Sequence, residues 1–341
     1  MSTQADFSRR RFLRQSFAFS ALASLGSLSP LANALAPTGG DAEILMIGDW
    51  GYEESTAGQT AVATGMRRYA QQHGVKPQAL LFLGDNWYGA LEGGAQSPRW
   101  KTQFEDMYPA TDFPCPAYAI LGNHDYQNFP GNKVENELEY ARSGKSRFTM
   151  PARWYSFEFP AKNPLITFIA LDSNVPHLDG STGSGRDFTL TAQQHAEQIA
   201  WFEGELKKPR ATPYLVVMGH HPIYSDGPHG DHAVLIRDWD PLFRKYKVPF
   251  YLAGHDHDLQ HLEFAGNPTS FVISGGGGAE LVDWTTPPEK RGPFGDKVIG
   301  FSDMEFSKDS IIFRHIDAQG RVLHTFRKTP DGKVEIFLPT A

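Results

Sequence analysis

One local pattern constrains the fold of this chain more than any other: a short apolar run, a glycine, and then a side chain that can bind a metal ion. Apolar runs of this length, bounded by glycine, are typical of buried strands in α/β proteins. The pattern recurs at five places, which are Ile44–Gly48, Leu80–Gly84, Tyr118–Gly122, Leu215–Gly219 and Phe250–Gly254. Because ligands bind at the carboxyl ends of such strands, the recurrence predicts that five strand ends converge on one site.

The side chains that follow these glycines are oxygen and nitrogen donors. They are Asp49, Asp85, Asn123, His220 and His255, with further candidates close by at Tyr88, His124 and His257. An aspartate at a strand end has two oxygens and can bridge two cations, and a phenol can bind a highly charged cation as phenolate. We therefore interpret Asp85 as a bridge between two metal ions and Tyr88 as a ligand of one. The simpler alternative for this one segment alone is an ordinary turn with the tyrosine packed below it.

The order of the remaining elements predicts a mixed α/β architecture. The spacing of apolar residues predicts helices over residues 60–72, 97–108, 191–207 and 232–246. Thr191 is the expected cap of the third helix, with Gln194 in the capping-box position. Strand patterns cover residues 154–159, 165–171, 271–274, 299–306, 310–317 and 321–327. Early strand–helix–strand units followed by late antiparallel strands indicate a mixed α/β fold.

Two segments have less regular patterns. Residues 126–151 are polar, with one weak helical stretch at 134–141, and we interpret them as a loop at the rim of the site. Gly275–Gly278 is not a phosphate-binding loop, because no Lys-Ser/Thr pair follows at the required spacing. We expect a close backbone passage or a turn at these glycines.

Residues 1–36 have the pattern of an export signal. Arginines at Arg9–Arg11 precede an apolar, uncharged run over residues 16–31 and small residues near Ala34 and Ala36. The paired arginines indicate the twin-arginine type, cleaved after Ala34 or Ala36, with the export machinery as a partner. The predicted destination is the bacterial periplasm or the exterior, and residues 41–335 would form a single domain. The alternatives are a retained anchor and a basic disordered tail, although the run is short of the roughly 20 residues of a membrane span.

Charge and cysteine content exclude several classes of function. Removal of residues 1–36 would take away four Arg and one Asp, which changes the net charge from −7 to −10. An acidic chain of this kind is not expected to bind nucleic acid, and after signal cleavage we expect no stable membrane insertion. Cys115 is the only cysteine, so no internal disulfide and no thiolate zinc site can form.

In this order the motif blocks resemble those of the purple acid phosphatases, which belong to the calcineurin-like metallophosphoesterase superfamily. The resemblance is to the small, mammalian-type, tartrate-resistant members and runs from Ile44 to about Arg327. Gly48-Asp49-Trp50-Gly51 and the segment Gly254–Gln260 carry the most specific matches. The fold that the resemblance implies is a four-layer α/β/β/α sandwich of two mixed sheets flanked by helices. Residues 125–147 match the family poorly, which leaves the substrate preference open.

The resemblance also implies roles for individual residues. A ferric ion would be held by Asp49, Asp85, Tyr88 and His257. A second, divalent ion (Fe, Zn or Mn) would be held by Asp85, Asn123, His220 and His255. His124 and His229 would face the phosphate of a small phosphorylated substrate as catalytic residues.

These roles together predict a secreted acid phosphatase. It would hydrolyse phosphate monoesters by in-line attack of a metal-bound hydroxide, with a binuclear centre lowering the pKa of that water. Three anionic ligands against a 3+/2+ ion pair leave excess positive charge, so the site would attract phosphate although the protein is acidic. The alternatives are a phosphodiesterase or nucleotidase of the same fold and a non-catalytic secreted phosphate- or metal-binding protein. The sequence leaves the natural substrate and the oligomeric state open.

Other polar residues have less specific interpretations. His221 adjoins a proposed ligand and is expected at the rim of the site. Asp125 and Asp256 are expected either to accept hydrogen bonds from ligand histidines or to lie in surface turns. Asp172 ends a strand as the proposed ligands do, but it fits an Asx turn equally well. The histidines that nothing gathers together are expected at the solvated surface, and these are His73, His177, His195, His315 and His324.

Overall fold

The computed structural model describes residues 37, 39–52, 55–127, 133–182, 188–284 and 286–337. The predicted export signal at residues 1–36 lies outside these ranges. Every helix within them is too short or too polar to span a lipid bilayer.

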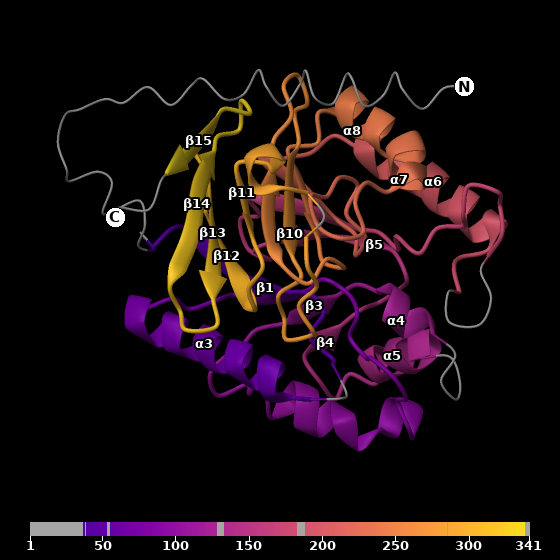
Figure 1. Cartoon of the computed structure of the whole chain (residues 1–341), viewed down its shortest axis with the longest axis vertical. Coiled ribbons are helices and arrows are strands. Elements are labelled where there is room, and N and C mark those ends of the chain that lie inside the picture. The colour runs from indigo at the N-terminus through magenta and orange to yellow at the C-terminus, as the bar shows by residue number, and fades with distance from the viewer. Residues whose placement is uncertain are drawn as a thin grey trace.

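Two mixed sheets are stacked face to face in the described part of the chain (Figure 1). The first has the strand order β15-β14-β13-β12-β1-β2-β3-β4, in which β1 to β4 are parallel and β12 to β15 antiparallel. Its strands are β1 (Ala42–Ile47), β2 (Ala79–Phe82), β3 (Ala117–Ala119), β4 (Phe148–Thr149), β12 (Gly300–Phe306), β13 (Ile311–Asp317), β14 (Val322–Lys328) and β15 (Val334–Phe337).

The second sheet has the order β11-β9-β10-β8-β7-β6-β5. Its central strands β10, β8, β7 and β6 are parallel, and β5, β9 and β11 are antiparallel to their neighbours. Its strands are β5 (Tyr155–Phe159), β6 (Ile166–Ala170), β7 (Tyr214–Met218), β8 (Phe250–Ala253), β9 (Leu259–Leu262), β10 (Ser270–Ser274) and β11 (Phe294–Asp296).

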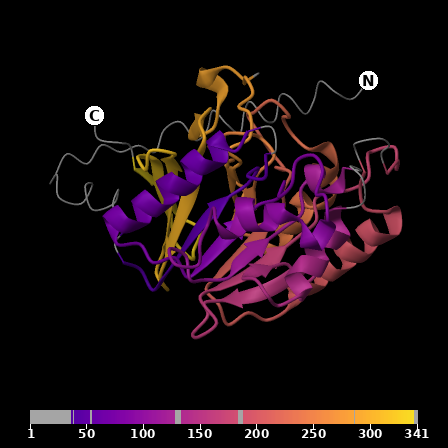
Figure 2. The same cartoon turned by 90° about the horizontal axis from the view of Figure 1, so that it is seen from below.

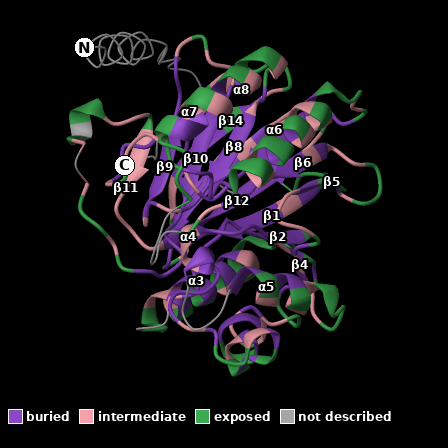
Figure 3. Ribbon diagram, turned by 90° about the vertical axis from the view of Figure 1, so that its right-hand side faces the viewer, coloured by how far each residue is buried: buried purple, intermediate pink, exposed green. Residues whose placement is uncertain are grey.

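Helices cover the outer faces of the two sheets. Helix α3 (Ala57–His73) lies against the first sheet near β12, as the view from below shows (Figure 2). Helices α6 (Ala192–Lys207), α7 (Ala233–Asp238) and α8 (Asp240–Tyr246) cover the second sheet, where they share an apolar core with β7 and β8. The strands between the helical layers are mostly buried, and the helices expose their outer faces (Figure 3). The predicted four-layer fold is therefore confirmed.

Most predicted elements are present, but two helices differ from the prediction. Within residues 97–108 only residues 98 and 99 are α-helical. They lead into the π-helix η2 (Trp100–Glu105), and the short 3₁₀ helix η1 (Gly94–Gln96) precedes both. Tertiary contacts override helical propensity here, because Trp100 stacks on Tyr140 with ring centroids 3.7 Å apart and Arg99 donates to three backbone carbonyls.

The predicted helix over residues 232–246 is divided into α7 and α8 at Trp239. Pro241 has no backbone N–H for the bond to residue 237, so a continuous helix would lose a hydrogen bond at this point. The helical stretch predicted at residues 134–141 is confirmed as helix α5 (Lys133–Arg142), which lies at the outer side of the first sheet.

The prediction that five isolated histidines lie at the solvated surface is wrong for three of them. His315 and His324 are 0% and 4% exposed, and His195 pairs with Asp238 at 2.9 Å. The first two lie on β13 and β14, on the faces that pack against the second sheet. Because these faces carry polar residues inside the core, the alternation of apolar and polar residues along the strands does not indicate that the histidines are buried. His73 and His177 are exposed, as expected.

The glycine run after β10 makes the expected close backbone passage. Gly277 donates its N–H to the carbonyl of Gly48 at 3.0 Å, and a Cβ at Gly277 would lie 2.1 Å from that oxygen. The run therefore packs β10 directly against the end of β1, where the first proposed metal ligand lies.

Candidate metal centre

The strand ends of both sheets converge as the sequence pattern predicts. Seven side chains lie together at this edge, and each follows the end of β1, β2, β3, β7 or β8. They are Asp49, Asp85, Tyr88, Asn123, His220, His255 and His257, with Asn123 opening the short helix α4 (Asn123–Tyr126). Both aspartates and His220 are at most 1% exposed. Buried donors of this kind need a compensating partner, because a buried charge without one is costly.

One group of donors surrounds the phenol of Tyr88. Its hydroxyl lies 3.0 Å from Asp85 Oδ2, 3.2 Å from Asp49 Oδ1 and 3.0 Å from His257 Nε2. The carboxylate of Asp49 and the imidazole of His257 approach each other within 3.6 Å. These four side chains are the set that the family resemblance implies for a ferric ion.

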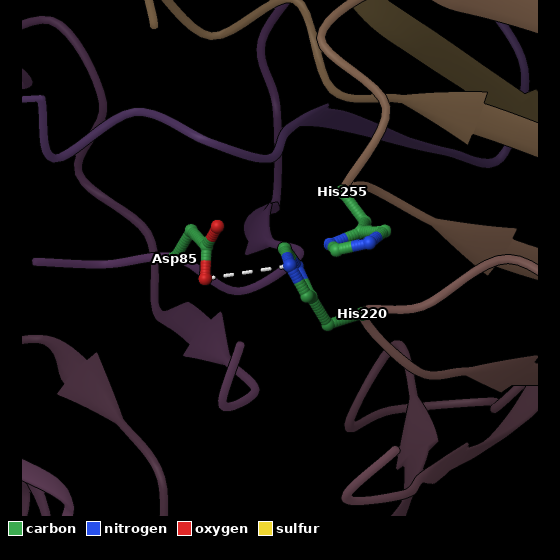
Figure 4. A group of neighbouring side chains, drawn as sticks. All are labelled: Asp85, His220 and His255. Atoms are coloured by element: carbon green, nitrogen blue, oxygen red, sulfur yellow. Dashed lines mark ion pairs between the residues drawn. The ribbon is translucent and has the colours of Figure 1, made fainter. Parts of the chain in front are cut away.

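A second group lies on the other side of the same aspartate. Asp85 Oδ1 is 3.3 Å from His220 Nε2, as drawn in Figure 4 together with His255. The side-chain oxygen of Asn123 lies 3.1 Å from His220 Nε2 and 2.9 Å from His255 Nδ1. Asp85 thus turns one oxygen toward each group, which is the arrangement expected of a bridging carboxylate.

The backbone at three of these positions is left-handed. Asp49, Asp85 and His255 have φ angles of 60°, 52° and 71°, which are uncommon for residues other than glycine. At His255 the positive φ turns the chain so that His255 and His257 reach different donor groups. Sequence periodicity does not contain this twist, and strain of this kind is characteristic of functional sites.

The glycines that precede the donors are required by close approach of side chains. A Cβ at Gly84 would lie 2.5 Å from the His220 ring, and one at Gly122 would lie 2.2 Å from Asp85 Oδ1. The recurrent glycine in the sequence pattern therefore makes room for a donor that arrives from another strand end.

Backbone carbonyls orient two of the imidazoles. His220 donates its Nδ1–H to Leu83 O at 2.8 Å, and His257 donates its Nδ1–H to Glu280 O at 2.5 Å. Each ring is left with Nε2 directed at the carboxylates, which is the tautomer that a metal-binding imidazole needs.

The electrostatics of the site favour a bound cation. Burial raises the pKa of Asp49 well above its ordinary value, and the neighbouring Asp85 raises it further. Burial also raises the pKa of the Tyr88 phenol, to which the charges of Asp85 and Asp49 add. Burial and the nearby imidazoles of His221 and His220 lower the pKa of His255, which keeps this ring neutral. A cation would reverse the penalty on the ionised forms of Asp49 and Tyr88.

The two predicted catalytic histidines flank the donors. The His124 ring lies 3.9 Å from the Tyr88 ring, and its Nε2 is 4.0 Å from Asp85 Oδ2. The His229 ring lies 4.2 Å from the His255 ring, and its side chain is 50% exposed. Both therefore border the donor groups from the solvent side.

Three aspartates have contacts that the sequence left open. Asp256 is fully buried and accepts from His229 Nδ1 at 2.6 Å, so it holds a proposed catalytic histidine and not a ligand. Asp125 accepts from backbone N–H groups and from the Asn86 amide of neighbouring loops. Asp172 forms an Asx turn, in which its Oδ1 accepts from the backbone N–H of Asn174 at 3.0 Å.

The sequence did not indicate the residues that form hydrogen bonds beneath and beside the proposed ligands. Ser173 lies 2.8 Å from His221 Nδ1, and the amide of Asn86 is fully enclosed beneath the donors. The position of Asn86 directly after Asp85 was a signal for the second of these, but nothing local shows that its side chain points inward.

The chain is similar to known proteins over most of its length. The model of the calcineurin-like phosphoesterase family matches residues 42–259. The tartrate-resistant acid phosphatase type 5 of Oryctolagus cuniculus is 28% identical over 88% of this chain and 94% of its own length. Purple acid phosphatase 7 of Arabidopsis thaliana is 28% identical over 88% and 90%, respectively. The resemblance predicted from the motif blocks is thereby confirmed.

A solved structure extends the comparison to the fold. GAP50, described as the anchor in the inner membrane complex of Plasmodium, superposes with a TM-score of 0.69 at 22% identity, and the match covers 83% of this chain and 87% of that one. Similarity at this identity concerns the arrangement of sheets and helices alone.

Proposed function

Since this chain belongs to the calcineurin-like phosphoesterase family, we propose that it is a binuclear-metal acid phosphatase that hydrolyses small phosphate monoesters. The observation that supports this most directly is the shared Asp85, which lies between two groups of oxygen and nitrogen donors. The relatives named as acid phosphatases cover most of the chain and indicate the same activity.

The donors fit two cations of different character. Asp49, Asp85, Tyr88 and His257 include three groups that can be anionic, which suits a highly charged ion such as Fe(III). Asp85, Asn123, His220 and His255 carry less charge and suit divalent Fe, Zn or Mn. When bound, the two ions would neutralise the phosphate and activate the water that attacks phosphorus.

The remaining residues would handle the substrate. His124 and His229 border the donor groups, where a protonated imidazole can bind a phosphate oxygen or donate a proton to the leaving oxygen. Asp256 accepts from Nδ1 of His229 and so directs Nε2 of that ring away from itself. In-line displacement would place the leaving group on the side of these histidines.

The test combines metal analysis, colour and hydrolysis. We expect the purified protein to contain iron plus a second metal, to be pink to purple from phenolate-to-iron charge transfer, and to cleave an aryl phosphate at acid pH. Tyr88→Phe should bleach the colour, whereas Tyr52→Phe, at a phenol whose ring lies 5.4 Å from the Tyr88 ring, should keep it. Active protein without iron and without colour would contradict the ferric assignment.

The same assay separates the alternatives. Faster cleavage of a bis-aryl phosphate than of an aryl phosphate would indicate a phosphodiesterase. Absence of hydrolysis by metal-loaded protein would indicate a binding protein. Hydrolysis that survives both Asp85→Asn and His124→Ala would show that the activity belongs to another site or to a contaminant.

We also propose that residues 1–36 are a twin-arginine signal, that residues 41–335 form one domain, and that the mature chain acts in the periplasm or outside the cell. The arginines at Arg9–Arg11 and the apolar run over residues 16–31 support the signal assignment. Mass spectrometry of exported protein should find an amino terminus at Leu35 or Pro37, and an unprocessed chain would contradict it.

A further inference from the structure

The amide of Asn86 occupies the centre of a buried polar cage directly beneath the metal-bearing loops. Its Oδ1 accepts from the Trp50 indole at 3.0 Å, and its Nδ2 donates to Ile120 O at 2.8 Å and to Glu137 Oε2 at 2.9 Å. These three partners come from the ends of β1 and β3 and from α5. Asn86 itself directly follows Asp85, so one side chain joins the three strand ends that carry Asp49, Asp85 and Asn123.

Asp125 completes the cage through the backbone. Its carboxylate accepts from the N–H groups of Trp87 at 2.9 Å, Asn86 at 3.2 Å and Gly122 at 2.8 Å, and also from the Asn86 amide at 3.2 Å. The loop after β2 and the loop after β3 are therefore fixed to the same carboxylate. Their relative position decides how far Asp85 lies from Asn123.

Helix α5 inserts two ionisable side chains into this cage, and burial beside Asp125 raises the pKa of one of them, Glu137, well above its ordinary value. Glu137 is 0% exposed and Lys133 is 1% exposed, although both could have pointed to solvent on an exposed helix. Lys133 donates to the carbonyls of Trp87 and Gly89, both at 2.7 Å. Burying such groups is costly, and an apolar helix face of the same volume would stabilise the fold at least as well. Stability alone therefore does not explain them.

We propose that Glu137 is a positioning residue of the metal centre, which acts through Asn86 and Asp125 to hold the loops that carry Asp85 and Asn123 at metal-binding distance. This rests on the proposed function, because it presupposes that the donors bind metal. Glu137 itself contacts none of the seven proposed metal ligands, so its effect on them is indirect. Partners that orient metal ligands typically change metal affinity or activity by about 10- to 100-fold when removed.

Two substitutions at this position separate hydrogen bonding from simple packing. Glu137→Leu keeps the volume but removes the acceptor of the Asn86 amide. Glu137→Gln keeps an acceptor for Asn86 and offers an N–H to Asp125. The control is Glu139→Leu, because Glu139 lies on the same helix and is exposed.

The primary measurement is the affinity of metal-free protein for Mn²⁺, by calorimetric titration, with kcat and KM on an aryl phosphate as the second. We expect Glu137→Leu to bind Mn²⁺ about tenfold more weakly and to lose about tenfold in kcat while KM changes less than twofold. Glu137→Gln should recover both values to within about threefold, and Glu139→Leu should match the wild type.

Each other outcome is informative. Wild-type affinity and kcat in Glu137→Leu would overturn the positioning role, as would a Gln variant as impaired as the Leu variant. A wild-type protein that binds no Mn²⁺ would instead overturn the proposed function. If Glu137→Leu does not fold, Trp50→Phe removes the indole N–H on the opposite side of the Asn86 amide. The same loss of Mn²⁺ affinity is then expected, and its absence would overturn the proposal.

Discussion

At the scale of single residues, the site is defined by which atom of each ring or carboxylate is available. Residue type was predictable from sequence, because donors follow glycine after each apolar run. Which ring nitrogen faces the site was not predictable, because it depends on partners far away in the chain. The carbonyls of Leu83 and Glu280, for example, fix the tautomers of His220 and His257. The contact between Asp256 and His229 belongs to the same class, since it joins residues 27 positions apart.

Asp256 is expected to act through His229. The variant Asp256→Asn removes the charge that holds Nδ1–H, so the ring loses its fixed tautomer and orientation. We expect kcat to fall about tenfold, compared with about a hundredfold for His229→Ala, which removes the imidazole itself.

The double variant decides whether the two residues form one unit. If Asp256 acts only through His229, then Asp256→Asn in the His229→Ala background should cause no further loss in kcat. Additive losses would show that Asp256 acts elsewhere. Metal content is measured in parallel, because Asp256 lies between His255 and His257 and a loss of metal would mimic the effect.

At the scale of elements, apolar spacing and capping residues correctly predicted the helices and strands that local sequence determines. The strands that precede the donors, helix α3 and helix α6 lie within a few residues of their expected bounds. One error occurred at η2, where a tertiary contact overrides a local preference. Another is β9, which was not predicted as a strand because its Gln260 and His261 are buried polar residues. A buried polar strand has no hydrophobic alternation to reveal it.

The capping box of α6 provides a direct test of a local prediction. Thr191 accepts from the Gln194 N–H at 3.2 Å, and the Gln194 side chain accepts from the Thr191 N–H at 2.9 Å. Thr191→Ala should lower the free energy of unfolding by about 1 kcal/mol, measured by urea denaturation of metal-free protein. Gln193→Ala, at an exposed position of the same turn, is the control, and equal effects of the two would contradict a capping role.

At the scale of the whole molecule, the two sheets are joined by buried histidines as well as by apolar packing. His315 on β13 donates Nε2–H to Gln260 O on β9 at 3.0 Å, and His261 on β9 bonds His324 on β14 at 2.9 Å. Sequence could not show these links, because the sheets pair residues about 60 positions apart. They place buried imidazoles at the interface on which the arrangement of the metal-bearing strand ends depends.

This interface should weaken in acid. Burial lowers the pKa of His315 from 6.5 to about 3, and burial with the charge of neighbouring imidazoles lowers that of His324 as well. Between these values the unfolded chain binds a proton that the folded chain does not, so stability falls as the pH drops below about 6.5. The slope is about 1.4 kcal/mol per pH unit for each such group, and about 3 kcal/mol is lost through His315 by about pH 4.5.

The variant His315→Gln tests this because an amide can donate to Gln260 O and accept from Ser302, which lies 2.9 Å from His315 Nδ1, without titrating. Urea denaturation of metal-free protein at about pH 7 and about pH 4.5 should show a loss of stability smaller by about 2–3 kcal/mol in the variant than in the wild type. His177→Gln, at an exposed imidazole, should leave the loss unchanged. Equal losses in His315→Gln and wild type would mean that the interface tolerates a charged imidazole. If the proposed acid activity is correct, bound metal must then offset this loss, because a ligand that binds only the folded state stabilises it.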